Sequence, residues 1–440
     1  MFKTLINAWK VPELRKKLLF TLLLLVIFRF GAIITAPGVD AVALNDAVQA
    51  SSSSLLQTIN FITGGAFSRL SIFAMSISPY ITASIVIQLL TYAIPALEEL
   101  SKEGEEGRRA ISRYTKYAAV ILAAVEAFGL YLTYRGQGVF IGEGVLVPLL
   151  FVMTLTAGST FLMWIGDQIT NKGVGNGISL LIFAGIVSGL PQTAQYLYGL
   201  AVVDGALSVS GLITAIAIII GAIILIAGVV WVTEAERRVP VQYAKRVVGR
   251  KMYGGQNTHI PIKLAMAGVM PVIFAMSFMQ FPAMIIQLIN PNIATATGFW
   301  AGAYKIFAYT SLTDVAFWPY GLVHSLIYLL LIVGFTFFYT MMVFNPVEVA
   351  NNLKKNGGFV PGIRAGKPTS DYLSGILKYI TWFGSFFLGV IAILPIVARV
   401  AGLQISFGGT AILIIVGVAL ETIRQLESQM LVRHYKGFLE

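Results

Sequence analysis

Apolar segments long enough to cross a lipid bilayer recur along this chain, and they limit its fold more than any other feature. A transmembrane helix needs about 20 mostly apolar residues. Hydrophobic residues make up 57% of the chain and charged residues only 12%, which is about half the charged share of a soluble protein. We predict ten spans, at about residues 18–36, 72–94, 117–134, 147–166, 178–198, 211–232, 264–289, 317–343, 372–396 and 409–424.

The basic residues are distributed unevenly between the loops that join these spans. The chain has 31 Lys and Arg residues and a formal net charge of +11. Ten spans place both termini on one side, and most of the basic residues fall on that side as well. Because basic loops stay in the cytoplasm, we expect both termini to be cytoplasmic, together with the loops at about 233–263 and 344–371.

Residues that carry catalysis or hold a metal form no recognisable arrangement. The chain has no cysteine, and its three histidines, His259, His324 and His434, are far apart and lack ligand spacing. The stretch GVGNG at 173–177 has no Lys-Ser/Thr pair of a nucleotide-binding loop, so we interpret it as a tight turn. We expect no catalytic residue, no metal and no cofactor, and a protein that is not an enzyme.

Ionisable side chains inside spans often mark pathways for ions or protons. Few are present here, among them Arg29, Glu126 and Lys378. A secondary transporter of a small solute is therefore weakly supported and stays an alternative. A lipid or signalling scaffold is a third class, which predicts no open path through the bundle.

The loops at 233–263 and 344–371 are long, basic and rich in Gly and Pro. Their candidate contact residues are Arg237, Arg238, Lys245, Arg246 and Arg364. Loops of this length with turn residues and aromatic anchors favour a docking surface over a purely topological role. Charge alone leaves the partner open between RNA and the anionic membrane surface.

Isoleucines repeat at helical spacing in two of the spans. Ile178, Ile182 and Ile186 share one face of the fifth span, and Ile81 and Ile85 share one face of the second. Such a stripe more often packs against lipid or protein. Its rarer use is an apolar ring that closes a water path by dewetting.

A short, half-apolar stretch, TGGAFSRLSIFAM at 63–75, directly precedes the second span. Ile62, Ala66, Leu70 and Phe73 fall on one helical face. The stretch is too polar to cross a bilayer alone. We predict a short amphipathic helix there, on the side opposite the termini.

Several long blocks of this sequence resemble the SecY family of protein-conducting channels. They are TGGAFSRLSIFAMSISPYITASIVIQLL (63–90), GNGISLLIFAGIVSGLP (175–191), ERRVPVQYAKR (236–246), MAGVMPVIFA (266–275), NPVEVANNLKKNGGFVPGIRAGKPT (345–369) and FGGTAILIIVGVALE (407–421). The resemblance covers essentially the whole chain in order.

The resemblance implies an all-α polytopic membrane protein. Its ten transmembrane helices would form two pseudo-symmetric five-helix halves, 1–200 and 201–440, around a central hourglass pore. Unfolded polypeptides would pass through the pore, and hydrophobic segments would leave sideways into the lipid bilayer. A partner motor, the SecA ATPase, or the ribosome would drive transport. SecE- and SecG-like small membrane subunits and signal-bearing polypeptides are further implied partners, and the implied location is the bacterial cytoplasmic membrane.

The resemblance also assigns roles to individual residues. The pore ring falls on Ile81, Ile85, Ile182, Ile186, Ile273 and Ile414. The plug, at about 60–72, includes Ile62, Thr63, Gly64, Gly65, Ala66, Phe67, Ser68, Arg69 and Leu70. Gln88 corresponds to a polar position of the lateral gate, through which segments reach lipid. Motor or ribosome docking falls on the basic loop residues named above.

Overall fold

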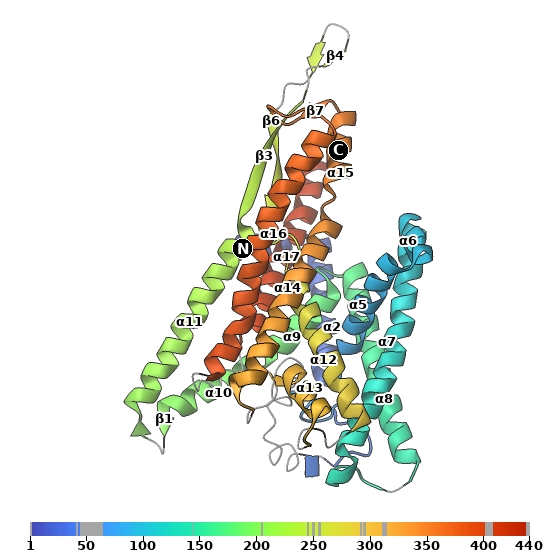
Figure 1. Cartoon of the computed structure of the whole chain (residues 1–440), viewed down its shortest axis with the longest axis vertical. Helices are drawn as coiled ribbons and strands as arrows, with labels where there is room; N and C mark the ends of the chain where they lie inside the picture. The colour runs from blue at the N-terminus through green and yellow to red at the C-terminus, as the bar shows by residue number, and fades with distance from the viewer. Residues whose placement is uncertain are drawn as a thin grey trace.

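The computed structural model shows a mostly helical molecule with a small β-sheet at one end of the helical bundle (Figure 1). It describes residues 2–40, 43–44, 65–142, 144–203, 206–243, 246–248, 251–253, 257–290, 293, 296–309, 315–400 and 408–436.

The helices are α1 (Phe2–Lys10), α2 (Pro12–Gly31), α5 (Ser78–Ala93), α6 (Pro95–Lys102), α7 (Glu105–Tyr134), η1 (Arg135–Gln137), α8 (Leu146–Lys172), α9 (Gly177–Ser188), α10 (Leu190–Ala201), α11 (Val209–Glu234), α12 (Met270–Ile289), α13 (Phe299–Phe307), η3 (Phe317–Gly321), α14 (Leu322–Val343), α15 (Pro346–Lys355), α16 (Lys367–Val400) and α17 (Gly409–Lys436). The strands are β1 (Val202–Val203), β2 (Ala206–Leu207), β3 (Glu236–Tyr243), β4 (Arg246–Val248), β5 (Lys251–Tyr253), β6 (Asn257–Lys263) and β7 (Gly358–Phe359).

The predicted spans correspond in order to helices of the structure. Among the described residues, eight helices or continuous helix pairs are long and apolar enough to cross a membrane, and α5 with α6 forms a ninth candidate bent by 99°. The first predicted span corresponds to α2, which begins and ends earlier than the predicted 18–36. Arg15, Lys16, Lys17 and Arg29 lie within α2, and this helix is not among the nine candidates above. The ten-helix fold class is confirmed.

The short amphipathic helix predicted around Ala66 and Leu70 is wrong for the described residues. Residues 65–77 form successive turns, and α5 begins only at Ser78. Gly65, Leu70 and Ser76 have positive φ angles of 88°, 38° and 51°, and a single left-handed residue interrupts an α-helix. The predicted plug residues Ile62, Thr63 and Gly64 lie outside the described residues.

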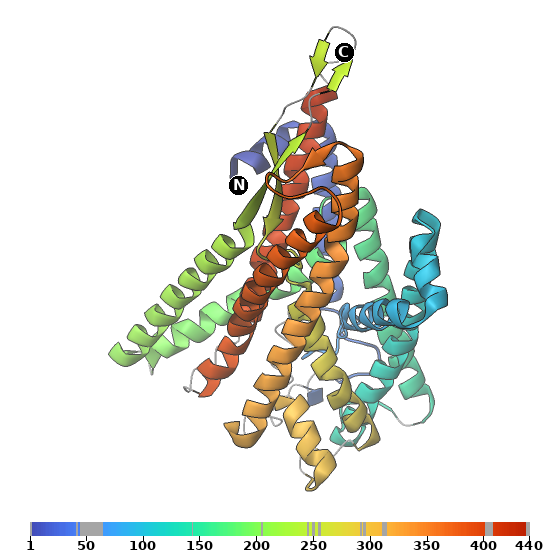
Figure 2. The ribbon, with the colours of Figure 1, turned by 45° about the horizontal axis from the view of Figure 1, so that its top comes forward.

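The two basic loops meet in one three-stranded antiparallel sheet, which we call the basic sheet (β6-β3-β7). Val239 of β3 pairs with Ile260 of β6, and Gln242 pairs with Phe359 of β7. Alternation along β3 buries Val239 and Val241 and exposes Arg238 and Pro240, as expected for a strand with one covered face. Figure 2 shows the sheet against the ends of the helices, with the β4–β5 hairpin beyond it.

Candidate pore and lateral seam

All six isoleucines predicted for the pore ring belong to one hydrophobic core. Ile85 of α5, Ile182 and Ile186 of α9, Ile273 of α12 and Ile414 of α17 are each at most 9% exposed, and Ile81 packs against them half-buried. We call these six side chains the isoleucine cluster. Four helices that are distant in sequence therefore bring the predicted residues together.

The turn before α9 sets the position of its isoleucines. The Asn176 side-chain oxygen accepts hydrogen bonds from the backbone amides of Ile178 (3.1 Å) and Ser179 (3.4 Å), which caps the helix. A Cβ on Gly177 would lie 2.0 Å from the carbonyl oxygen of Gly166, so α9 crosses α8 closely there. The glycine-rich stretch at 173–177 is thus a turn that joins two packed helices.

A seam runs where α5 and α7 meet α12 and α14. The Tyr339 hydroxyl of α14 donates a hydrogen bond to the side-chain oxygen of Gln88 on α5. One turn further along α5, the Tyr92 ring meets Phe338 edge-on, with ring centroids 5.0 Å apart. On the other pair of helices, a Cβ on Gly129 of α7 would lie 3.1 Å from a methyl carbon of Leu288 on α12.

Gln88 therefore lies at the seam, in the region predicted for the lateral gate. Its amide nitrogen also donates to the Ser84 hydroxyl (3.2 Å). The contacts described across the seam are one hydrogen bond, one edge-on ring contact and the packing of Leu288 against Gly129. No ion pair joins the two sides among the described residues. Such contacts separate at modest cost, because no buried charge is left unpaired.

Residues 65–77, which we call the covering segment, contribute side chains to two hydrophobic cores, one of which contains the isoleucine cluster. Phe73 belongs to the same core as the isoleucines, whereas Leu70 is buried in a second core with residues of α7 and α8. Of these two side chains, Phe73 and not Leu70 therefore shares a core with the isoleucine cluster. Ala66 and Phe67 are buried, Arg69 is exposed, and Ser68 is half-buried.

Backbone contacts fix the covering segment on two sides. The Ala36 amide donates to the Leu70 carbonyl (2.9 Å), and the Ile72 amide donates to the Ile34 carbonyl (3.0 Å). On α8, the Ser159 hydroxyl donates to the Ser76 carbonyl (3.3 Å). A Cβ on Gly158 would lie 1.8 Å from the Ile72 carbonyl oxygen, so only glycine admits this approach.

The basic sheet presents its arginines to solvent. Arg237, Arg238 and Arg364 are exposed, and the Arg238 guanidinium binds the Glu236 carboxylate at 2.7 Å. That arginine lowers the pKa of Glu236, mainly by hydrogen bonding. Arg246 begins β4, and Lys245 lies outside the described residues. The buried face of the sheet packs through Val239, Val241, Ile262, Leu353, Val360, Leu373 and Leu377.

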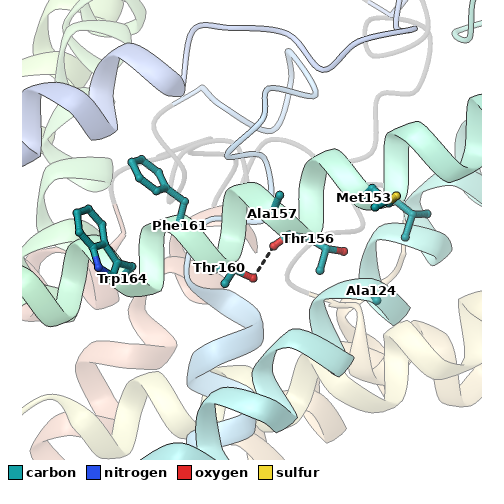
Figure 3. Close-up of a pocket in the computed structure, with 8 residues that line it drawn as sticks. Ala124, Met153, Thr156, Ala157, Thr160, Phe161 and Trp164 are labelled. Atoms are coloured by element: carbon teal, nitrogen blue, oxygen red, sulfur yellow. Dashed lines mark hydrogen bonds between the residues drawn. The ribbon is translucent and has the colours of Figure 1, made fainter.

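An apolar groove of about 620 Å³ lies on α8 (Figure 3). It is lined by Ala124, Val152, Met153, Thr156, Ala157, Thr160, Phe161 and Trp164. None of these side chains is ionisable, and the Thr160 hydroxyl donates to the Thr156 carbonyl of its own helix (2.7 Å). The described residues contain no group of metal-binding side chains.

The SecY family profile matches residues 71–423, which include the isoleucine cluster and both seam faces. The chain belongs to the SecY family. The protein translocase subunit SecY of Streptomyces coelicolor is 44% identical over 454 aligned positions, covering 100% of each chain.

Solved channel structures share the fold of this SecY-family chain. The structure of a protein-conducting channel matches with a TM-score of 0.65 and 22% identity, covering 94% of this chain and 92% of that one. Sec61 in a canine ribosome-channel complex from the endoplasmic reticulum matches with a TM-score of 0.61 and 21% identity, over 94% and 92% of the chains.

Membership of the SecY family settles the broad class of the protein. It is a multi-pass membrane protein and a protein translocase subunit, of a family of channels rather than enzymes. The solute-transporter alternative is not favoured. Sequence reasoning named Phe73 only as one member of an apolar face, and it missed Tyr339, because the local pattern of α14 does not indicate which distant side chain that tyrosine meets.

Proposed function

We propose that this chain forms the pore of a protein translocation channel and that the isoleucine cluster is its constriction. The convergence of six isoleucines from four helices carries the proposal. An apolar constriction excludes ions, because an ion that enters it loses its hydration. The same side chains offer no charge that would hold a passing polypeptide. Two halves, 1–200 and 201–440, flank this constriction.

The seam is the proposed lateral gate for hydrophobic segments. Separation of α5 and α7 from α12 and α14 breaks the hydrogen bond between Gln88 and Tyr339 and the ring contact of Tyr92. A segment that is apolar enough then partitions from the pore into lipid. The proposed plug, about 60–72, covers the constriction from the side opposite the basic sheet, and its described residues are held by α8.

The basic sheet is the proposed docking surface for the driving partner. Exposed Arg237, Arg238 and Arg364 lie on the two loops that the sheet joins, and Lys245 and Arg246 extend the basic sequence. The SecA motor ATPase and the ribosome are the proposed partners, the latter in keeping with the ribosome-bound canine relative of the same fold. SecE- and SecG-like subunits complete the proposed complex in the bacterial cytoplasmic membrane, with both chain termini in the cytoplasm.

Site-specific crosslinking tests the pore assignment directly. A photoreactive amino acid at Ile182 should crosslink to an export substrate that is stalled by a folded domain at its end, and the crosslink should disappear when the substrate is released. Ile223 on α11 is the control, because its side chain is 60% exposed on the outside of the bundle. Equal crosslinking at both positions, or none at Ile182, would contradict the proposal.

A further inference from the structure

Helix α13 has one buried face and one exposed face, and the exposed face is aromatic. Ala301, Tyr304 and Ala308 are buried against Ala283 and Ile286 of α12. At the start of the same helix, Phe299 and Trp300 are 81% and 64% exposed. A helix face that meets water normally carries polar side chains, so this exposed face requires another explanation.

The surroundings of α13 continue this aromatic character. Trp318 of η3 is 71% exposed, and Tyr320 of η3 lies under the ammonium group of Lys305, with 6.0 Å from the nitrogen to the ring centroid. Lys305 is the single charged residue of α13. Aromatic rings with one cation are typical of the zone where lipid headgroups meet water.

The position of α13 agrees with such a zone. It directly follows the apolar helix α12, whose last residue Ile289 is 76% exposed. In both views it lies at the end of the bundle remote from the basic sheet (Figures 1 and 2). On α14, which contacts α13, Leu326 and Leu330 are 57% and 71% exposed, so a neighbouring helix exposes apolar side chains as well.

Helix α13 is also fixed to both helices that form one side of the seam. Its buried face packs on α12, as described above. The buried His324 ring of α14 makes a hydrogen bond through Nδ1 with the Ile306 carbonyl of α13 (2.7 Å). A movement of α13 is therefore transmitted to the ends of α12 and α14.

We propose that α13 and the adjoining η3 form an interfacial anchor, which inserts Phe299, Trp300 and Trp318 among the phospholipid headgroups of the leaflet remote from the basic sheet. The anchor holds the ends of α12 and α14 at a fixed depth while the rest of the seam separates. The inference deepens the proposed function, since it assigns lipid as the partner of the lateral gate. Anchoring itself does not depend on translocation and is measured separately.

The depth of Trp300 in a bilayer tests the proposal. The chain has six tryptophans, and replacing Trp9, Trp164, Trp231, Trp318 and Trp382 with Phe leaves Trp300 as the single tryptophan, which is excited selectively over tyrosine at the long-wavelength edge of its absorption band. The protein is reconstituted into phosphatidylcholine–phosphatidylglycerol vesicles that carry bromine either near the headgroup or near the end of the acyl chain. Bromine near the headgroup should quench Trp300 severalfold more strongly than deep bromine.

A second single-tryptophan protein supplies the control. Trp382 lies in the middle of α16 and is 52% exposed, so deep bromine should quench it more strongly. The proposal that α13 is an anchor would be contradicted if aqueous iodide quenched the Trp300 fluorescence fully and neither bromolipid quenched it. A depth profile equal to that of Trp382 would contradict it as well, because Trp300 would then lie in the hydrocarbon.

Discussion

At the scale of the residue, each side chain of the isoleucine cluster is a hydrocarbon without a hydrogen-bond donor or acceptor for water in the proposed pore. Ile186 is fully buried and Ile85 is 4% exposed, and both are branched at Cβ, which restricts their rotamers. Side chains that are stiff and apolar leave little room for a continuous file of water. The proposed seal therefore depends on the chemistry of these few groups.

Serine at these two positions should open a water path. In the double variant Ile85→Ser and Ile186→Ser, two hydroxyls replace two branched apolar groups, so dewetting of the constriction weakens. We expect the resting ion conductance in planar bilayers to rise severalfold. Ile223→Ser, at an exposed position of α11, should leave the conductance unchanged. If the double variant conducts ions no better than the unmodified protein, the isoleucine cluster does not form the seal.

The residue scale also shows what a sequence can and cannot predict. The spacing of Ile182 and Ile186 places both on one face of a helix, and the structure places that face inward. The partner of Gln88 is different, because Tyr339 lies 251 positions away. Only the packing of α5 on α14 brings the two together, and no local pattern records that packing.

At the scale of the element, the covering segment is the main departure from expectation. Helical spacing of Ala66, Leu70 and Phe73 predicted a helix, yet the backbone turns at Gly65, Leu70 and Ser76. Hydrogen bonds to Ile34 and Ala36 hold the segment instead. Tertiary contacts thus outweigh the local periodicity, and any displacement of residues 65–70 has to break them.

Gly158 on α8 gives a way to loosen this segment. In Gly158→Ala the new Cβ would overlap the Ile72 carbonyl, and relief of such overpacking costs about 1–3 kcal/mol. We expect a cysteine at the fully buried Ser71 to react faster with a water-soluble maleimide in this background.

Gly228→Ala on α11 is the matched control, since a Cβ there meets nothing within 4 Å. It should leave the labelling rate unchanged. If the two alanine variants label at the same rate, α8 does not hold the covering segment.

The strand pairing of the basic sheet could not be predicted from the sequence either. Basic charge and turn residues predicted a structured docking surface in each loop, and the alternation of Val239 and Val241 is compatible with a strand. The pairing of Gln242 with Phe359 joins chain segments more than a hundred positions apart. Because strand partners of this kind are chosen by the fold as a whole, the two loops could not be united from the sequence alone.

At the scale of the whole molecule, the seam lies where the contacts between described residues are neutral. The proposed channel has two exits, one through the pore and one sideways into lipid. A covalent bond across the seam should close the second exit and leave the first open. The chain has no native cysteine, so Gly129→Cys with Leu288→Cys introduces the only thiols, at positions in direct contact across α7 and α12. Oxidation should block the release of hydrophobic segments into lipid.

A pair on one side of the seam provides the comparison. Ala83→Cys with Ala119→Cys joins α5 and α7, whose side chains share one buried cluster. Crosslinking of this pair should leave lipid integration intact. If the oxidised and reduced forms of the Gly129–Leu288 pair integrate hydrophobic segments into lipid equally well, the seam is not the route of their release.

The pairing of β3, β6 and β7 has a mechanical consequence. β3 follows α11 almost without a break, β6 ends at Lys263 shortly before α12, and β7 precedes α16. We therefore expect a force applied to the sheet by the proposed docking partner to reach α11, α12 and α16. Because α12 is the helix of the three that also borders the seam, this force should act on the proposed lateral gate.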